Sequence, residues 1–271
     1  MAGPDTKLPT SLRAKARWRR LTVAKVPVML VHPDWESATP APVVLWMHGR
    51  TVDKELDPGR YLRWMRAGIA VCAVDLPGHG ERFDDELQQP DRSLDVVRQM
   101  IDEIGPIVDA LDAMGVFDLD RAAIGGVSAG GMAALARLCT EHRFRCVAVE
   151  ATSGSWRHQA HRPMFQDREE ESAGLDPIEH LAGWREVPLQ ALHARYDEWM
   201  PIEGQQAFID ALRRHYREPD LVEFIRYDRT GAAYEHAGFG RMASEAKNKQ
   251  LDFLKRRLLP SFSSSSSSPN G

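Results

Sequence analysis

The sequence contains little cysteine. Its 271 residues include three, Cys72, Cys139 and Cys146, and none of them has the CxxC spacing of a redox or zinc motif. An odd number of cysteines does not build a disulfide framework and fits a reducing compartment. We therefore predict a cytoplasmic protein, and we expect neither a metal nor a cofactor.

Long apolar runs and an excess of one charge are also missing. No run approaches the roughly 18 apolar residues of a membrane-spanning helix, and the basic N-terminal segment is not followed by the apolar stretch of a secretory signal. With 35 basic and 39 acidic residues, the formal net charge is -4. This balance gives no electrostatic footprint for nucleic acid or an anionic membrane, so we expect neither as a partner. The oligomeric state stays open.

Short apolar runs alternate with helical patterns along the chain. Runs typical of buried strands lie at 42–49, within 68–80, and at 121–128, 146–152, 187–194 and 221–228, and residues 18–31 suggest one or two more strands. Helical periodicity appears at 58–67, 94–111, 131–139, 203–216 and 240–258. Pro106 is expected to kink or split the second of these helices. The alternation predicts an α/β fold with a mostly parallel central sheet flanked by helices.

We predict one domain at 18–259, between a flexible N-terminal segment at 1–17 and a disordered serine-rich tail at 260–271. Residues 155–185 interrupt the alternation with a short polar insertion. It carries Trp156, Phe165, Trp184 and the acidic run DREEE. Two interpretations of the insertion stay open, a small cap over an active site and a solvated surface excursion.

The stretch IGGVSAGG at 124–131 places four glycines around Ser128. A Gly-x-Ser-x-Gly match occurs by chance in about one of ten proteins of this length. Here the match follows an apolar strand and precedes an alanine-rich helix, which is the setting of a strained turn that exposes a serine nucleophile. The N-terminus of the helix also favours an anion that forms beside the serine.

A serine hydroxyl reacts only when a base takes its proton, and a carboxylate usually orients that base. His236 lies in a glycine-rich loop after the last strand, at the sheet edge where catalytic groups collect. Asp197 follows the strand at 187–194. Asp228 and Glu150 also end strands, so they remain rivals for the role of the acid.

From about residue 20 to 258, the chain resembles the α/β-hydrolase superfamily, in the branch of serine esterases, prolyl-oligopeptidase-like proteins and dienelactone-hydrolase relatives. The order Ser128, Asp197, His236 is the order of that superfamily. Four further stretches are similar to its motifs: VVLWMHGRT, AVDLPGHGER, the run ending in ALHARYDEWMP, and YEHAGF.

The resemblance implies an α/β-hydrolase fold with Ser128 as nucleophile, Asp197 as orienting acid and His236 as base. The backbone N–H groups of Arg50 and Ala129 would form the oxyanion hole. Three further residues are candidate substrate contacts: Thr51, Trp156 and Trp199. The Arg50 side chain either meets a substrate carboxylate, closes the pocket wall or pairs with an acid. We expect His48 and His79 to be hydrogen-bonded structural histidines of their turns.

The activity implied by the resemblance is that of a serine hydrolase with a small-molecule ester substrate. It would cleave carboxylic esters of small to medium acyl groups through an acyl-enzyme intermediate. One alternative is a small serine peptidase or aminoacyl hydrolase of the prolyl-oligopeptidase type. A second is a non-catalytic binding protein of the same fold. The presence of all three triad residue types disfavours this second alternative.

Overall fold

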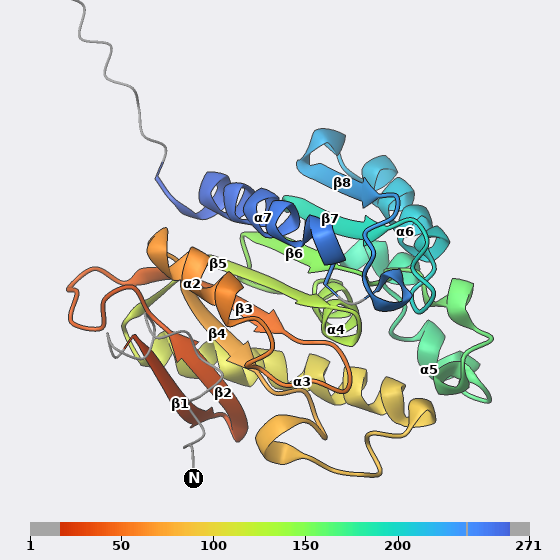
Figure 1. Ribbon diagram of the computed structural model, residues 1–271, viewed down its shortest axis with the longest axis horizontal. Coiled ribbons are helices and arrows are strands. Elements are labelled where there is room, and N and C mark those ends of the chain that lie inside the picture. Colours follow the sequence, from red (N-terminus) through yellow and green to blue (C-terminus); the bar gives the residue numbers. More distant parts are fainter. Residues whose placement is uncertain (1–16, 237, 261–271) are drawn as a thin grey trace, which may run out of the picture.

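The computed structural model describes residues 17–236 and 238–260, and within them one eight-stranded sheet has the order β1-β2-β4-β3-β5-β6-β7-β8 (Figure 1). The strands are β1 (Trp18–Val23), β2 (Val26–Val31), β3 (Ala41–Met47), β4 (Ala70–Val74), β5 (Phe117–Val127), β6 (Cys146–Glu150), β7 (Leu189–Ala194) and β8 (Val222–Tyr227). Strand β2 pairs antiparallel with β1 and β4, whereas β3 to β8 are parallel. The predicted fold class is confirmed.

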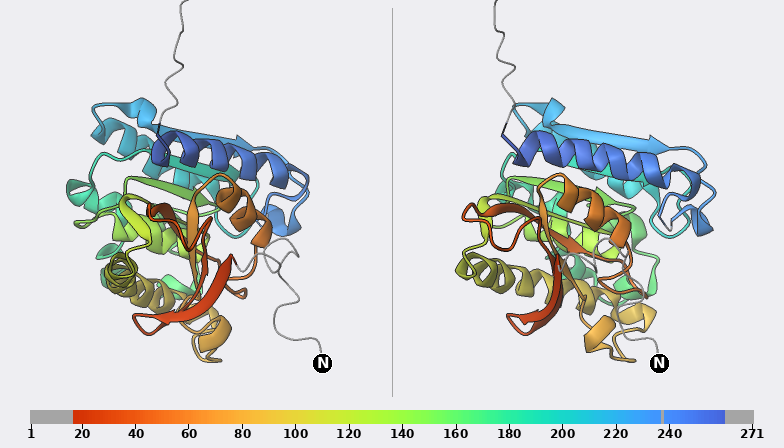
Figure 2. Two further views of the ribbon diagram at one scale, coloured as in Figure 1. Left: turned by 90° about the vertical axis from the view of Figure 1, so that its left-hand side faces the viewer. Right: turned by 60° about the vertical axis from the view of Figure 1, so that its left-hand side comes forward.

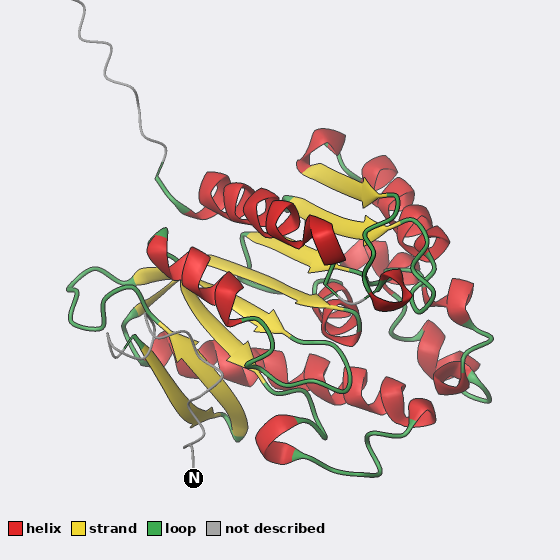
Figure 3. Cartoon of the chain, viewed as in Figure 1, coloured by secondary structure: helices red, strands yellow, loops and turns green. Residues whose placement is uncertain are grey.

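Helices cover both faces of the sheet. They are α2 (Pro58–Arg66), α3 (Ser93–Ala113), α4 (Ala129–Arg137), α5 (Glu169–Ala173), α6 (Ile202–His215) and α7 (Ala243–Leu258). Figures 2 and 3 show α2 and α7 on one face and α3 on the other. Neighbouring residues of β3 point to opposite faces, since Trp46 packs with the α2 and α7 side and Met47 with the α3 and α4 side. This double coverage explains why the central strands are apolar throughout.

Helix α3 runs through Pro106 without a break, from Ser93 to Ala113. Of the two predicted effects of this proline, the split is therefore wrong, and the kink stays a prediction. Apolar side chains on both sides of the proline, including Met100, Ile107 and Leu111, are buried in the same core. Their burial outweighs the single hydrogen bond that proline removes.

Two of the predicted segments lie almost wholly outside the described residues. The predicted flexible segment at 1–17 has only Arg17 within them, and the predicted serine-rich tail at 260–271 has only Pro260. None of the helices within the described part of the chain is long and apolar enough to span a membrane.

The outer glycines of the IGGVSAGG stretch sit where strands and helix approach most closely. A Cβ atom on Gly125 would lie 2.0 Å from the carbonyl oxygen of Ala148 on β6, and one on Gly131 would lie 2.7 Å from the Thr152 side chain. Both distances are too short for a real contact, so these glycines are required by packing and the stretch is not a flexible loop.

We expect Gly125→Ala to lower the free energy of unfolding by about 1–3 kcal/mol or more, because β5 must move away from β6 to admit the methyl group. The matched control is Gly59→Ala in α2, where the added Cβ would lie 3.6 Å from the Arg63 guanidinium and 3.8 Å from the Asp57 carboxylate, which are ordinary contact distances. That change is expected to leave stability unchanged or to raise it by up to about 1 kcal/mol. Urea denaturation of both variants measures the difference, and equal stability of the two would contradict the close approach at Gly125.

Candidate active site

Ser128 occupies a sharp turn between β5 and α4, with φ 52° and ψ -118°. This left-handed backbone is strained for any residue with a side chain. Backbone hydrogen bonds hold the turn: the Ser128 N–H donates to the Glu150 carbonyl (3.0 Å), and the Ser128 carbonyl accepts from the Met132 N–H (2.9 Å). The Thr152 hydroxyl donates to the same carbonyl at 2.8 Å. The strain is thus maintained by contacts from β6 and α4.

The inner glycines of the turn allow the strand and the helix to meet. A Cβ on Gly126 would lie 2.6 Å from the Gly130 carbonyl carbon, and one on Gly130 would lie 2.5 Å from the Met47 carbonyl oxygen. The end of β3 is thereby brought against the start of α4. Small residues at these two positions are a physical requirement of the turn.

Ala129 and the loop that carries Arg50 lie beside the serine. Ala129 is the first residue of α4, so its N–H has no partner within the helix. Arg50 follows Gly49, on which a Cβ would lie 3.4 Å from the Ser128 Cβ. The loop after β3 therefore passes directly beside Ser128. The N–H groups of Ala129 and Arg50 are the two that the sequence predicts for an oxyanion hole.

The side chain of Arg50 is hydrogen-bonded to the start of α3 and to the segment before it. Its guanidinium donates to the Ser93 hydroxyl at 2.6 Å and to the Gln88 carbonyl. Burial lowers its pKa below the ordinary arginine value. These two bonds direct the side chain toward residues 88–93, so it joins the loop after β3 to the segment that precedes α3.

Asp197 and His236 form a buried hydrogen-bonded pair from two different loops. Nδ1 of His236 lies 2.8 Å from Oδ2 and 3.0 Å from Oδ1 of Asp197. The Trp199 and Met200 N–H groups donate to Asp197 Oδ1 at 2.9 and 2.7 Å. The contact at Nδ1 leaves Nε2 as the imidazole nitrogen suited to exchange a proton with a hydroxyl. Asp197 follows β7, His236 follows β8 and Ser128 follows β5, so all three lie at the carboxyl edge of the parallel sheet.

The two rival carboxylates have other partners. Glu150 receives two hydrogen bonds from the Arg60 guanidinium, at 2.6 and 2.8 Å, in the buried layer beneath α2. Asp228 is largely exposed and pairs with Arg195 at 2.7 Å. Of the three candidate acids, Asp197 is the one that the structure brings to His236.

Two residues that sequence reasoning did not assign to the site hold the Asp197 loop in place. The buried His193 contacts the Met200 carbonyl at 2.7 Å through Nε2, which lies 3.7 Å from Asp197 Oδ2. Burial lowers its pKa, which favours the neutral ring. Arg162 donates to the carbonyls of Glu198 and Trp199. The four-residue spacing between His193 and Asp197 is a signal that could have identified His193 as part of the site. Arg162 lies in the polar insertion, where no sequence pattern marks it.

His48 and His79 have the structural role that the sequence predicts. The Leu76 N–H donates to His48 Nε2 at 3.0 Å, and His48 Nδ1 lies 2.5 Å from the Gly49 carbonyl. His79 Nδ1 lies 2.8 Å from the Pro77 carbonyl. Burial lowers the pKa of His48 to about 4, which keeps the ring neutral at pH 7. The His48 ring joins the turns after β3 and β4, the His79 ring bonds within the turn after β4, and the predicted structural role of both is confirmed.

The insertion at 155–185 is folded onto the domain as α5 and short 3₁₀ helices. Its three aromatic residues Trp156, Phe165 and Trp184 are buried. The insertion is anchored to α3 by the Arg168–Asp95 ion pair at 2.6 Å and to the Asp197 loop by Arg162. Figure 1 shows α5 on the side of the sheet to which the strand arrows point. This placement favours the cap interpretation, which stays a prediction.

The three candidate substrate contacts are placed differently. Trp156 is 1% exposed and its indole N–H donates to the Ser153 carbonyl, so the structure does not bring it to the surface of the site. Thr51 is exposed with φ 64°, and its hydroxyl donates to the Arg50 carbonyl at 2.7 Å. Trp199 is 42% exposed and its ring centroid lies 5.2 Å from that of His236.

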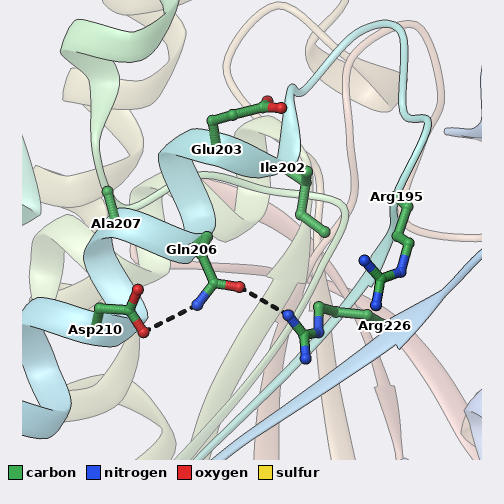
Figure 4. A pocket seen from close by; sticks show the side chains of 7 residues that line it. All are labelled: Arg195, Ile202, Glu203, Gln206, Ala207, Asp210 and Arg226. Atoms are coloured by element: carbon green, nitrogen blue, oxygen red, sulfur yellow. Dashed lines mark hydrogen bonds between the residues drawn. The ribbon is translucent and has the colours of Figure 1, made fainter.

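A surface pocket of about 430 Å³ opens beside the Asp197 loop, between α6 and the ends of β7 and β8 (Figure 4). Its lining is mostly charged or polar: Arg195, Ile202, Glu203, Gln206, Ala207, Asp210 and Arg226. Arg226 donates to Gln206 at 3.1 Å, and Gln206 donates to Asp210 at 2.9 Å. None of the predicted site residues lines this pocket, so it is separate from the Asp197–His236 pair.

Comparison with known protein families gives one family match. The model of the prolyl oligopeptidase family matches residues 59–259. The matched range includes Ser128, Asp197 and His236, and it ends just after α7.

Among curated proteins, the chain is similar to Esterase YjfP of Escherichia coli (strain K12). The two are 26% identical over 251 residues, which cover 87% of this chain and 97% of the relative. It is also similar to Putative esterase YitV of Bacillus subtilis (strain 168), with 23% identity over 228 residues, 75% of this chain and 88% of the relative.

Among solved structures, TT1662 from Thermus thermophilus has a TM-score of 0.71 and 23% identity, covering 90% of this chain and 98% of the other. A Mycobacterium tuberculosis puromycin-hydrolyzing peptidase has a TM-score of 0.71 and 16% identity, covering 89% of this chain and 40% of the other. At these identities the likeness establishes the fold, which is that of the α/β-hydrolases.

Proposed function

Because the chain belongs to the prolyl oligopeptidase family of serine hydrolases, we propose that it is a carboxylesterase that acts on small-molecule esters of small to medium acyl groups. The observation that carries the proposal is the buried Asp197–His236 pair, with 2.8 Å between Nδ1 and Oδ2, at the sheet edge where Ser128 occupies its strained turn. The esterase names of the two curated relatives support ester over amide chemistry.

In the proposed reaction, His236 Nε2 takes the proton of the Ser128 hydroxyl while Oγ attacks the ester carbonyl carbon. The carbonyl oxygen becomes an oxyanion, which the N–H groups of Arg50 and Ala129 stabilise. The C–O bond to the alcohol then breaks, and the alcohol oxygen receives the proton from His236. Water then attacks the acyl carbon while His236 takes its proton, the bond between that carbon and Oγ breaks, and His236 returns the proton to Ser128 Oγ as the acid leaves.

A second candidate is hydrolysis of peptides or aminoacyl amides. The family to which the chain belongs is named for an oligopeptidase, and this supports the candidate. The two activities share the same nucleophile, base and oxyanion hole, so the acyl and leaving groups of the substrate decide between them.

We expect a panel of p-nitrophenyl esters, from acetate to octanoate, to be hydrolysed with higher kcat/KM than aminoacyl p-nitroanilides. The ester-to-anilide ratio of kcat/KM should exceed the ratio of the uncatalysed hydrolysis rates of the two substrate classes. A fluorophosphonate probe should modify Ser128, which peptide mapping of the labelled protein checks. Preference for the anilides would favour the peptidase candidate, and folded protein without a Ser128 adduct would contradict every serine-hydrolase proposal.

We further propose that the hydrolase works in the cytoplasm. The support is the low number of cysteines and their lack of paired spacing. Comparing activity in cytosolic and membrane or extracellular fractions of the source cells tests this location.

A further inference from the structure

Two large aromatic rings are exposed beside His236. Trp199 is 42% exposed and Tyr234 is 56% exposed. Their ring centroids are 5.2 Å apart with an interplanar angle of 27°, which is a stacked arrangement. We call Trp199 and Tyr234 the aromatic pair. Exposed aromatic surface that is gathered in one place commonly marks a binding site.

The aromatic pair is held in position by the two loops that carry the predicted acid and base. The Trp199 N–H donates to Asp197 Oδ1 at 2.9 Å. The Glu198 N–H donates to the Tyr234 carbonyl at 3.0 Å, which ties the loop after β7 to the loop after β8. Arg162 from the insertion donates to the Trp199 carbonyl. The pair is therefore part of the same rigid arrangement as Asp197 and His236.

The loop under Tyr234 adopts a backbone that side chains rarely take. Tyr234 has φ 55° and Glu235 has φ 49°, both in the left-handed region. The Glu235 carboxylate stabilises this shape, because it accepts from the Thr230 N–H at 2.6 Å, the Thr230 hydroxyl at 2.7 Å and the Gly231 N–H at 3.0 Å. Strained residues that their surroundings hold in place cluster at functional sites.

The position of the pair relative to His236 identifies the part of the substrate that it would meet. The Trp199 ring centroid lies 5.2 Å from that of His236, with 35° between the rings. In the proposed reaction His236 returns its proton to the alcohol oxygen, so this oxygen lies within hydrogen-bond reach of the imidazole. A group carried by that oxygen is therefore close to the aromatic pair, whereas the acyl group is on the other side of the carbonyl carbon.

This step rests on the proposed esterase function: we propose that the aromatic pair is a subsite for the alcohol part of the substrate and selects esters of aromatic alcohols. A planar ring on the alcohol can stack against Tyr234 or Trp199 in an offset or edge-to-face arrangement. A saturated ring of the same size lacks the quadrupole that favours those arrangements. Trp199 and Tyr234 are then specificity-determining residues for the leaving group.

The test compares benzyl acetate with cyclohexylmethyl acetate. Both form the same acetyl-enzyme, and both release a primary alcohol with a six-membered ring, so the ratio of their kcat/KM values isolates the contact with the alcohol. We expect the wild-type protein to prefer benzyl acetate. Tyr234→Leu should lower the benzyl-to-cyclohexylmethyl ratio by about 2- to 12-fold, the size of one aromatic pair interaction, and Tyr234→Phe should restore it.

Two further variants make the result decisive. Tyr234→Gly removes the ring and suits the left-handed backbone at φ 55°, so it replaces the leucine variant if that one fails to fold. Tyr196→Leu is the matched control, because Tyr196 is 51% exposed but stacks beneath Arg229 at 4.4 Å, and its loss should leave the ratio unchanged.

The outcomes separate this inference from the function on which it rests. If both acetates are hydrolysed and removal of the Tyr234 ring leaves their ratio unchanged, the alcohol subsite is overturned and the esterase proposal stands. Equal slowing of both acetates would show that Tyr234 acts only by positioning His236, which also overturns the subsite. If folded wild-type protein hydrolyses neither acetate and takes no fluorophosphonate adduct, the esterase proposal fails and the subsite fails with it.

Discussion

Ser128→Ala is expected to lower kcat for p-nitrophenyl acetate by about 10⁶-fold, with little change in Tm. The variant lacks Ser128 Oγ, the atom of the protein that the proposed reaction joins to the acyl group. The turn keeps its contacts, because those that hold it use the backbone N–H and carbonyl of Ser128. Alanine also retains the Cβ that lies beside Gly49. Steady-state assays and thermal unfolding of the same preparations measure the two effects.

The control for this variant is a serine with a hydroxyl far from the proposed chemistry. Ser37 is exposed and its hydroxyl donates to the Thr39 carbonyl within a surface turn. Ser37→Ala should keep wild-type turnover and fluorophosphonate labelling. A Ser128→Ala protein that retains activity within tenfold of wild type would contradict the assignment of the nucleophile.

The turn around Ser128 and the sheet could be predicted from sequence because the causes of both are local. Buried parallel strands need continuous apolar runs, and the turn around Ser128 needs glycines wherever backbone meets backbone, as at Gly126 and Gly130. Both requirements can be recognised in a few consecutive residues. The strand that ends at Val127 and the helix that starts at Ala129 can be recognised in the same way.

The strand pattern alone left three candidate acids, and only the family resemblance favoured Asp197, because the cause of the choice is not local. Glu150 ends β6 much as Asp197 follows β7, and the difference lies in Arg60, 90 residues away in the chain. The guanidinium enters from α2 and takes both oxygens of Glu150. A pattern of apolar runs contains no information about such a pairing.

The surroundings of His236 were likewise beyond sequence reasoning. Tyr234 reads as an ordinary loop residue until its left-handed backbone and its stack on Trp199 are known. Arg162 belongs to a polar insertion without a recognisable pattern, yet it contacts the carbonyls of the Asp197 loop. Conversely, Trp156 of the insertion is a predicted substrate contact, and it packs inside that segment with 1% exposure.

Asp197→Asn is expected to lower kcat by about 10⁴-fold without unfolding the protein. The asparagine carbonyl oxygen can still accept the Trp199 and Met200 N–H groups that now bind Oδ1. Its amide NH₂ then faces His236 Nδ1 and donates to it, so the imidazole proton moves to Nε2. A ring protonated at Nε2 cannot take the Ser128 proton. The pH dependence of kcat/KM and the rate of fluorophosphonate labelling both report this loss of the base.

The rival carboxylates provide controls of two kinds. Asp228→Asn removes a surface charge that pairs with Arg195, and it should leave kcat near that of wild type, because exposed ion pairs contribute little. Glu150→Gln breaks a buried pair with Arg60, which typically costs about 3–5 kcal/mol of stability. Its activity must therefore be measured below the onset of its thermal unfolding transition and expressed per folded molecule. A larger decrease in kcat for Asp228→Asn or folded Glu150→Gln than for Asp197→Asn would contradict this assignment. The substituted residue would then be the acid that acts with His236, and the Asp197–His236 contact would be structural.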